Sequence, residues 1–217
     1  MIATRVVPRP GVDPTLVWRR GNAVLRGAGV EPGRHPSLLA ARVQPPSRDP
    51  FSDRLRHGLA MLLAAVDSRQ DGLASAAGRC LIGAGPGLTP LGDDYVGGSA
   101  VAVSAFGGAT GFHGAARRRW LDALLPPDLL RRTTPVAAGL LEMARDRRAA
   151  PPLDGVLDLG PEGDANLHSS LADLLAVGSS TGRGWATAIG ATAFLLAANA
   201  AQDGPENANE QRRRSPT

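Results

Sequence analysis

The sequence predicts an α+β fold, in which a small β-rich N-terminal lobe precedes a mainly α-helical lobe. The first observation behind this prediction is that eight of the 18 prolines fall in residues 1–50, between short β-leaning segments. The second is that apolar residues recur at helical spacing from Phe51 onward. The third is a glycine-rich loop that leads into a further helix. A chain of 217 residues can bury a sizeable core around these parts.

Residues 1–50 form the predicted β-rich lobe. Turns that contain Gly and Pro separate its short, β-leaning segments. The expected strands are Thr4–Val7, Thr15–Arg19, Ala23–Arg26 and Ala41–Gln44.

Residues 51–201 form the predicted helical lobe. Leu55, Leu59, Leu62 and Val66 are spaced three or four residues apart, which predicts a helix over Asp53–Ala77. The other expected helices are Pro90–Phe106, Gly114–Leu125, Pro135–Arg147, Asn166–Ala176 and Arg183–Ala200. Residues 202–217 are polar and charged, offer little to bury, and are predicted to be a disordered tail.

Cysteine usage and hydropathy predict a cytoplasmic protein. Cys80 is the single cysteine, which excludes an intramolecular disulfide framework and a multi-cysteine zinc site and fits a reducing compartment. The first residues lack the apolar run of a signal peptide, and no run of roughly 18–20 uninterrupted apolar residues is present. We therefore expect no membrane association.

The basic residues are all arginine, and this excludes several chemistries. The formal charge is +4 and the sequence pI is about 10.7, but 20 acidic residues are spread through the same chain. Aromatic residues make up only 4 %, so the sequence gives little support for nucleic-acid binding. Because lysine is absent, a Schiff base to pyridoxal phosphate (PLP), a Walker-type phosphate lysine and a serine–lysine dyad are all excluded.

A glycine-rich loop at residues 83–92 is the strongest functional signal. Gly83, Gly85 and Gly87 precede Leu88 and Thr89, and Pro90 then suits the first position of a helix that Thr89 would cap. Glycines before a helix N-terminus let backbone N–H groups approach an anion. The spacing matches neither the dinucleotide fingerprint nor a P-loop, so no NAD is expected, and the loop is interpreted as an anion-binding cradle.

Asp93 and Asp94 follow this loop in the first turn of the predicted helix. Two carboxylates would repel a bound anion unless a cation lay between them, and Mg²⁺ takes carboxylate oxygens and bridges to phosphate. They could instead complement the helix dipole, for about 0.3–1 kcal/mol each. Both interpretations remain open from the residues alone.

A second segment is expected to face the first. Gly97 and Gly98 place small residues on the helix that follows the loop, which implies a closely packed neighbouring helix. The turn at residues 178–182 and the small-residue helix after it fit that neighbour, with Ser180, Thr181 and Gly182 framing a pocket and Arg183 supplying donors to an anion. An ordinary capped helix is the alternative interpretation.

Other candidate residues are expected to be structural. Thr133 and Thr134 precede Pro135 as a helix cap, although Arg132 or Thr133 could face a substrate. Cys80 has no activating partner in the sequence and fits a buried structural thiol. The histidines lack metal-ligand spacing and are expected at the surface: His35, His57, His113 and His168.

These motifs resemble the AllH-like family of oxamate carbamoyltransferase subunits. The string LIGAGPGLTPLGDDYVGGSAVAV at residues 81–103 is similar to that family's glycine-rich motif. The later strings RTTPVAAGLLEMA (132–144) and VGSSTGRGWATAIG (177–190) resemble its two downstream blocks. Gly184 departs from the family pattern, which usually has an aspartate at this position.

The resemblance implies a role in carbamoyl transfer between oxalurate and phosphate in allantoin-type purine catabolism. It implies a small anionic substrate such as carbamoyl phosphate or oxamate, and further protein subunits as partners. Asp93 and Asp94 would be the catalytic residues and would hold Mg²⁺ or water, while Gly83–Thr89 and Thr181–Arg183 would bind substrate. A non-catalytic metabolite-binding or scaffold subunit of a larger complex is the alternative.

Overall fold

The computed structural model describes residues 4–6, 12–32, 51–149 and 151–202, and these are mainly α-helical. Their elements, in chain order, are β1 (Thr4–Arg5), α1 (Pro14–Gly27), α3 (Ser52–Ser68), α4 (Asp71–Leu81), α5 (Leu91–Phe106), α6 (Gly114–Leu124), the 3₁₀ helix η1 (Leu129–Arg131), α7 (Pro135–Arg145), β2 (Arg148–Ala149), α8 (Pro151–Leu157), α9 (Pro161–Leu175) and α10 (Thr181–Gln202).

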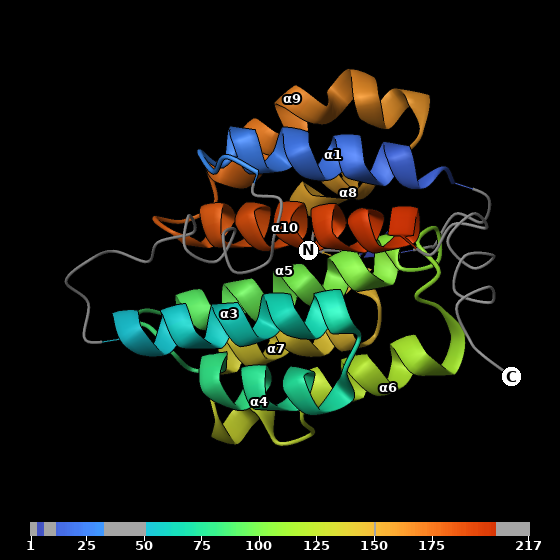
Figure 1. Ribbon diagram of the computed structural model, residues 1–217. Coiled ribbons are helices and arrows are strands. Elements are labelled where there is room, and N and C mark those ends of the chain that lie inside the picture. The colour runs from blue at the N-terminus through green and yellow to red at the C-terminus, as the bar shows by residue number, and fades with distance from the viewer. Residues whose placement is uncertain (1–3, 7–11, 33–50, 150, 203–217) are drawn as a thin grey trace, which may run out of the picture.

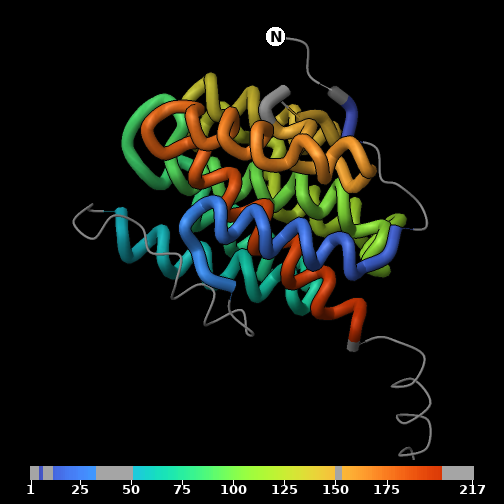
Figure 2. Tube along the Cα trace, turned by 90° about the horizontal axis from the view of Figure 1, so that it is seen from above, coloured from blue at the N-terminus to red at the C-terminus, as the bar shows by residue number. Residues whose placement is uncertain are grey.

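Helices α5 and α10 lie side by side at the centre of the molecule. Helices α1, α8 and α9 cover α10 on one side, and α3, α4, α6 and α7 surround α5 on the other (Figure 1). Viewed from above, α1 lies across α10 (Figure 2). The central pair packs very closely, because a Cβ atom built at Gly98 would lie 2.8 Å from the Ala188 Cβ. The close neighbour expected from Gly97 and Gly98 is therefore confirmed.

The predicted β-rich N-terminal lobe is wrong, and the fold is mainly α. Helix α1 occupies the segments where strands were expected at Thr15–Arg19 and Ala23–Arg26. Of the described part of the expected strand Thr4–Val7, residues 4–6, only β1 forms, and it pairs antiparallel with β2, with Thr4 opposite Ala149. The segment Ala41–Gln44 lies outside the described residues.

The sequence of α1 contains the helix signals that the prolines obscured. Asp13 caps the helix by accepting from the Thr15 N–H at 2.8 Å, and Pro14 follows at the first helical position. Val17, Val24 and Leu25 are fully buried on one face. These positions repeat with helical spacing, so tertiary burial outweighs the β propensity of valine.

The helical predictions from residue 51 onward are largely confirmed. The expected helix Asp53–Ala77 is two helices, because Arg69 adopts a left-handed conformation (φ 54°) that ends α3. The helix expected at Asn166 begins earlier, at Pro161, and α8 was not anticipated. The boundaries proposed at residues 50/51 and 201/202 stay predictions, since residues 33–50 and 203–217 lie outside the description.

Helix α10 is the one described helix with the length and hydropathy of a membrane span. Over Thr181–Ala201 its mean hydropathy reaches 1.3, although no uninterrupted apolar run is present. Within the structure, 78 % of that window is buried, with α1 on one side and α5 on the other. Its apolar composition is accounted for by its place in the protein core.

Candidate functional site

The glycine-rich loop adopts a conformation that needs glycine at three positions. Gly83, Gly85 and Gly87 have φ angles of +75°, +123° and +93°. At Gly83 a Cβ atom would lie 2.2 Å from the Arg132 carbonyl oxygen, whereas at Gly87 it would meet nothing within 4 Å. Gly83 is therefore required by packing, and Gly87 faces open space.

Thr89 does not cap α5, contrary to the sequence-based expectation. Pro90 occupies the cap position without a side-chain hydrogen bond, and the Gly92 N–H donates to the Ala84 carbonyl oxygen at 2.9 Å. The Thr89 hydroxyl instead lies 2.7 Å from the Thr181 hydroxyl at the start of α10. This contact joins the loop to the turn before α10, so the expected proximity of the two helix starts is confirmed.

The first turn of α7 holds the loop from the other side. Thr134 caps α7 by accepting from the Ala137 N–H at 3.1 Å, and its hydroxyl donates to the Leu88 carbonyl oxygen. The neighbouring Thr133 hydroxyl donates to Asp93 at 2.5 Å. Both threonines were expected to be mainly structural, and these contacts show that they position the loop.

A cavity of about 610 Å³ lies between the loop, α7 and the turn before α10. It brings together five of the residues predicted to bind substrate: Gly87, Leu88, Thr89, Ser180 and Thr181. The other residues lining it are Pro86, Val136, Leu140, Leu153, Leu174, Val177, Gly178, Ser179 and Trp185. The lining therefore has a rim of hydroxyls and backbone amides and a larger apolar surface.

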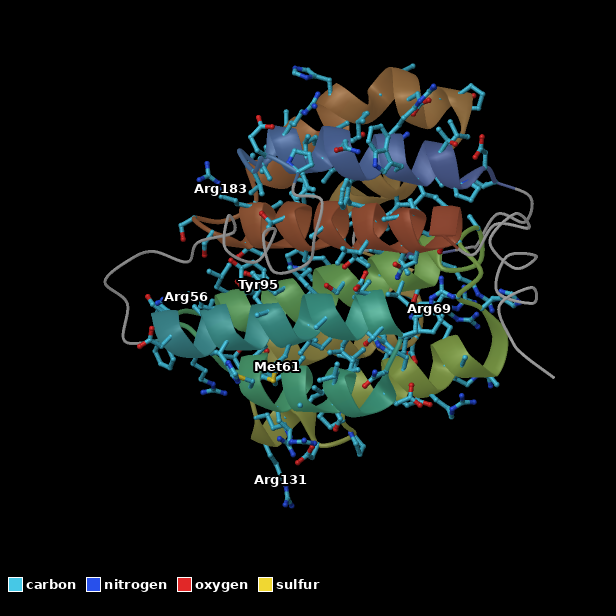
Figure 3. All side chains as sticks on the ribbon, in the orientation of Figure 1. Arg56, Met61, Arg69, Tyr95, Arg131 and Arg183 are labelled. Atoms are coloured by element: carbon cyan, nitrogen blue, oxygen red, sulfur yellow. The ribbon has the colours of Figure 1, made fainter. Side chains whose placement is uncertain are left out.

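Four of the residues predicted to bind substrate do not line this cavity. Gly83 and Gly85 shape the loop behind it, and Gly182 is buried where a Cβ would lie 1.8 Å from the Leu174 carbonyl oxygen. Arg183 is exposed and projects away from the molecule near the start of α10 (Figure 3). No arginine lines the cavity among the described residues, so its donors are uncharged.

Trp185 is the main site residue that sequence analysis missed. It stands four residues after Thr181, one helical turn further along the same face of α10, and this spacing could have identified it. Its ring lines the cavity, while its indole Nε1–H donates to Asp94 Oδ1 at 3.1 Å. Trp185 thus connects the cavity to the buried carboxylates.

Asp93 is buried with both carboxylate oxygens hydrogen-bonded. Oδ1 accepts from the Gly83 N–H at 3.0 Å and Oδ2 from the Thr133 hydroxyl. Burial raises the pKa of Asp93, while these two bonds and the charge of Arg54 oppose that rise. Asp93 therefore fastens the loop and α7 to the start of α5.

Asp94 is buried and has one oxygen without a partner. Only 1 % of the residue is exposed, and Oδ2 has no hydrogen-bond partner within the described part of the chain. Burial raises the pKa of Asp94 to about 8; the Trp185 hydrogen bond opposes this rise and the charge of Asp93 adds to it. At neutral pH the carboxyl group is mainly protonated and can donate a proton.

The expected Mg²⁺ site gains no support from this arrangement. Asp93 and Asp94 lie in a narrow crevice with Thr89, Leu140 and Trp185, which has no room for a water molecule. Mg²⁺ needs six oxygen ligands and usually keeps several waters. Three of the four carboxylate oxygens already accept hydrogen bonds. No group of three metal-ligating side chains occurs among the described residues.

Gly184 packs directly against Asp94. A Cβ atom at this position would lie 2.8 Å from the Asp94 Cβ and 3.4 Å from its Oδ2. An acidic side chain here would crowd the carboxyl group and place a second charge beside it. Glycine at 184 is therefore compatible with a neutral Asp94.

The remaining candidates take no part in the cavity. His57, His113 and His168 are exposed, as expected, and His35 lies outside the described residues. Cys80 is half-buried, and its thiol contacts the Arg54 carbonyl oxygen at 3.4 Å.

The fold and site define a helical protein with a ligand-sized cavity framed by a glycine-rich loop and a second helix start. A family model described as oxamate carbamoyltransferase subunit AllH matches residues 81–193, from the end of α4 into α10. The chain belongs to this family, as its motifs indicated. Comparisons with curated proteins and with solved structures gave no match.

Proposed function

We propose that this chain is a subunit of an oxamate carbamoyltransferase and binds a small planar anion at the polar rim of its cavity. The observation that carries this proposal is the contact between Thr89 and Thr181, which closes the glycine-rich loop onto the turn before α10. Family membership and the cavity both support it. The ligand class is oxamate, oxalurate or carbamoyl phosphate, each of which carries negative charge beside a carbonyl group.

The rim offers hydrogen-bond donors that no acceptor uses within the part of the chain that the structure describes. The backbone N–H groups of Gly85, Gly87, Leu88 and Thr89 donate to no acceptor among the described residues. Three of these residues line the cavity, and the hydroxyl groups of the turn face them across it. Convergent amides stabilise carboxylate and phosphate oxygens without a positive side chain. The anion would therefore sit at the loop.

The reaction needs a proton at the leaving nitrogen. A phosphate oxygen attacks the carbamoyl carbon of oxalurate, the bond from that carbon to the oxamate nitrogen breaks, and the nitrogen takes up a proton to leave as oxamate. Asp94 is suited to supply that proton, since its carboxyl group is mainly protonated at neutral pH. In the reverse direction the Asp94 carboxylate would accept it. Because the crevice is closed, this step requires the side chains of Leu140 and Trp185 to move apart.

The rest of the cavity suits a partner chain better than a small anion. Leu88, Val136 and Val177 are 71 %, 50 % and 37 % exposed at its edge. The family is described as a subunit, so we propose that another subunit of a cytoplasmic complex covers this apolar edge. Such coverage would exclude water from the rim and strengthen its hydrogen bonds.

Substitution of Gly87 tests the rim directly. Gly87→Ala adds a methyl group that meets no atom of the protein, at a φ that disfavours a side chain. Gly29→Ala is a matched control, because Gly29 has φ +79° and also lies in open space, at the end of α1. Both changes should cost about 1–2 kcal/mol of stability through backbone strain. Only Gly87→Ala should weaken binding of oxamate or carbamoyl phosphate, measured by calorimetry and by thermal shift.

The assay is run with and without the partner subunits. Binding of these anions by the wild-type chain or its complex, reduced in Gly87→Ala and unchanged in Gly29→Ala, is the expected result. If neither anion binds even in the complex, the rim is not a substrate site.

A non-catalytic metabolite-binding or scaffold subunit is the second candidate, and the apolar edge of the cavity favours it. For a scaffold, Leu88→Ser should impair assembly with the partner subunits, while Asp94→Asn should leave the turnover of the assembled complex unchanged. For the catalytic subunit, Asp94→Asn should lower turnover without impairing assembly. Turnover of the purified complex, with assembly measured by gel filtration, separates the two candidates.

A further inference from the structure

A second cavity, of about 430 Å³, is lined by residues of α6 and of the end of α7 and opens to solvent. Four arginines line it together with two aspartates and two apolar or small residues: Gly114, Arg117, Arg118, Leu121, Asp122, Arg145, Asp146 and Arg147. The glycine-rich cavity contacts the first half of α7 through Val136 and Leu140, whereas Arg145 is the last residue of that helix. The two cavities therefore lie at opposite ends of α7.

Two arginines of this cavity, Arg117 and Arg147, repel each other. Burial, and then the charge of Arg147, lower the pKa of Arg117. None of the four arginines forms an ion pair with a described acidic side chain, although the neighbouring Arg119 pairs with Asp71 at 3.4 Å. Asp122 and Asp146 are exposed, and the lining keeps a formal excess of two positive charges over them. An anion in the cavity would relieve this repulsion.

Arg147 occupies a backbone conformation that favours glycine. Its φ is 57°, and among the described residues only Arg69 shares a positive φ without being glycine. Arg69 has internal partners in this position, since it donates to the Thr110 carbonyl oxygen at 3.0 Å and packs over the Phe112 ring. The Arg147 guanidinium has no hydrogen-bond acceptor within the described residues. Its side chain is thus held at the cavity at a conformational cost and without an internal acceptor.

Two of the other arginines are fixed in place through only part of their donor sets. Arg145 donates from Nη2 to the Leu125 and Pro126 carbonyl oxygens, while its Nε and Nη1 groups donate to no acceptor in the described part of the chain. Arg117 reaches the Ser104 carbonyl oxygen from Nη1 at 3.4 Å. Gly114 places the N-terminus of α6 at the same cavity, where the helix dipole also favours an anion. Planar guanidinium groups match phosphate oxygens in pairs.

We propose that this arginine-lined cavity is a second anion site, which binds the phosphate groups of a small phosphorylated compound. The carrying observation is the gathering of Arg117, Arg145 and Arg147 around one cavity with unused donors. Its volume accommodates a diphosphate as well as a single phosphate group. The site is separate from the glycine-rich loop and does not depend on the function proposed for that loop.

Calorimetric titration with inorganic pyrophosphate, at constant ionic strength in chloride buffer, tests the proposal. The wild-type chain should bind pyrophosphate, and Arg117→Gln with Arg147→Gln should weaken binding about tenfold or more. Arg131→Gln is the control for the loss of one arginine charge, because Arg131 is exposed and projects away from this cavity (Figure 3). It should bind as the wild type does. Inorganic phosphate and sulfate titrations show whether two linked phosphates are needed.

Arg147→Gly separates a loss of binding from a loss of folding. Glycine adopts a φ of 57° without strain, so this variant should keep or raise the melting temperature while losing affinity for pyrophosphate. Failure of the wild type to bind pyrophosphate overturns the proposal, and so does equal binding by Arg147→Gly. Binding that is lost in Gly87→Ala but kept in the arginine variants also overturns it, since the anion would then occupy the glycine-rich loop.

Discussion

Replacing Asp94 by asparagine should remove a large part of the pH dependence of stability. The pKa of Asp94 is raised by burial from 3.8 to about 8, so the folded chain holds a proton between these pH values that the unfolded chain releases. The favourable contribution of the protonated group is fully present below about pH 4 and is lost progressively as the pH rises toward 8. Asparagine is neutral throughout and keeps an oxygen that can accept from the Trp185 indole.

The structure sets the size of this effect. Each pH unit between the two pKa values costs about 1.4 kcal/mol of unfolding free energy, and less as the pH nears 8, so the wild type should lose about 2 kcal/mol from Asp94 between pH 6 and pH 8. Asp94→Asn should lack this loss. Below about pH 4 the two proteins should differ by less than about 1 kcal/mol, because the protonated carboxyl and the amide make similar hydrogen bonds. By pH 6 the wild type should already be about 3 kcal/mol less stable than Asp94→Asn, because the unfolded chain has released the proton that the folded chain still holds.

Urea denaturation at half-unit intervals from pH 5 to pH 9 measures both profiles. Their difference isolates the contribution of Asp94, since all other titrating groups are shared. Parallel profiles would refute the reasoning, because they would mean that Asp94 titrates equally in the folded and unfolded chain. Asp93→Asn is the control. Asp93 now accepts from two donors, and an asparagine would turn its own NH₂ group toward one of them. This substitution should therefore lower the free energy of unfolding by about 1–3 kcal/mol even at pH 6.

Three further predictions concern the same region. Trp185→Phe removes the donor to Asp94 and should raise the pKa of that carboxyl further. The loss of stability with rising pH should then continue to a higher pH than in the wild type. Gly98→Ala should lower the free energy of unfolding by at least about 2 kcal/mol in urea denaturation, because its Cβ would lie 2.8 Å from a neighbouring Cβ. Gly139→Ala is the contrasting variant: Gly139 is exposed within α7 with no atom within 4 Å, so alanine there should raise the free energy of unfolding by about 0.5–1 kcal/mol. Calorimetric titration with Mg²⁺ should show little binding if the hydrogen-bonded crevice persists, and binding lost on replacing Asp93 and Asp94 by asparagine would restore the metal interpretation.

Sequence periodicity was sufficient for most helices because their apolar faces are long. Helix α6 was expected at Gly114–Leu125 and forms over Gly114–Leu124. Helix α1 was misassigned because the prolines around it suggested strands, even though Asp13 and Pro14 form a helix start. The break at Arg69 also could not be foreseen, since arginine rarely adopts a left-handed backbone and glycine would have signalled it.

The site was partly predictable for a different reason. The loop and the Thr181 turn were identified by local residue types, and the close approach of their helices followed from Gly97 and Gly98. The direction of each side chain was not predictable. Thr89 faces Thr181 instead of capping α5, and Arg183 faces solvent, because a helix position fixes a side chain's direction only once its neighbours are known.

The packing of the loop has a consequence for how relatives of this chain should be compared. Gly83 and Gly92 are constrained by backbone atoms of the protein, since a Cβ at either position would lie within 2.2 Å of a carbonyl oxygen. A relative could therefore retain this motif to preserve its fold after losing its ligand. Gly87 is not constrained by packing, since a Cβ there would meet no atom and the residue lines the open cavity, although its φ of +93° favours glycine. Changes at Gly87 would therefore be a better guide than changes at Gly83 or Gly92 to which relatives still bind the same compound.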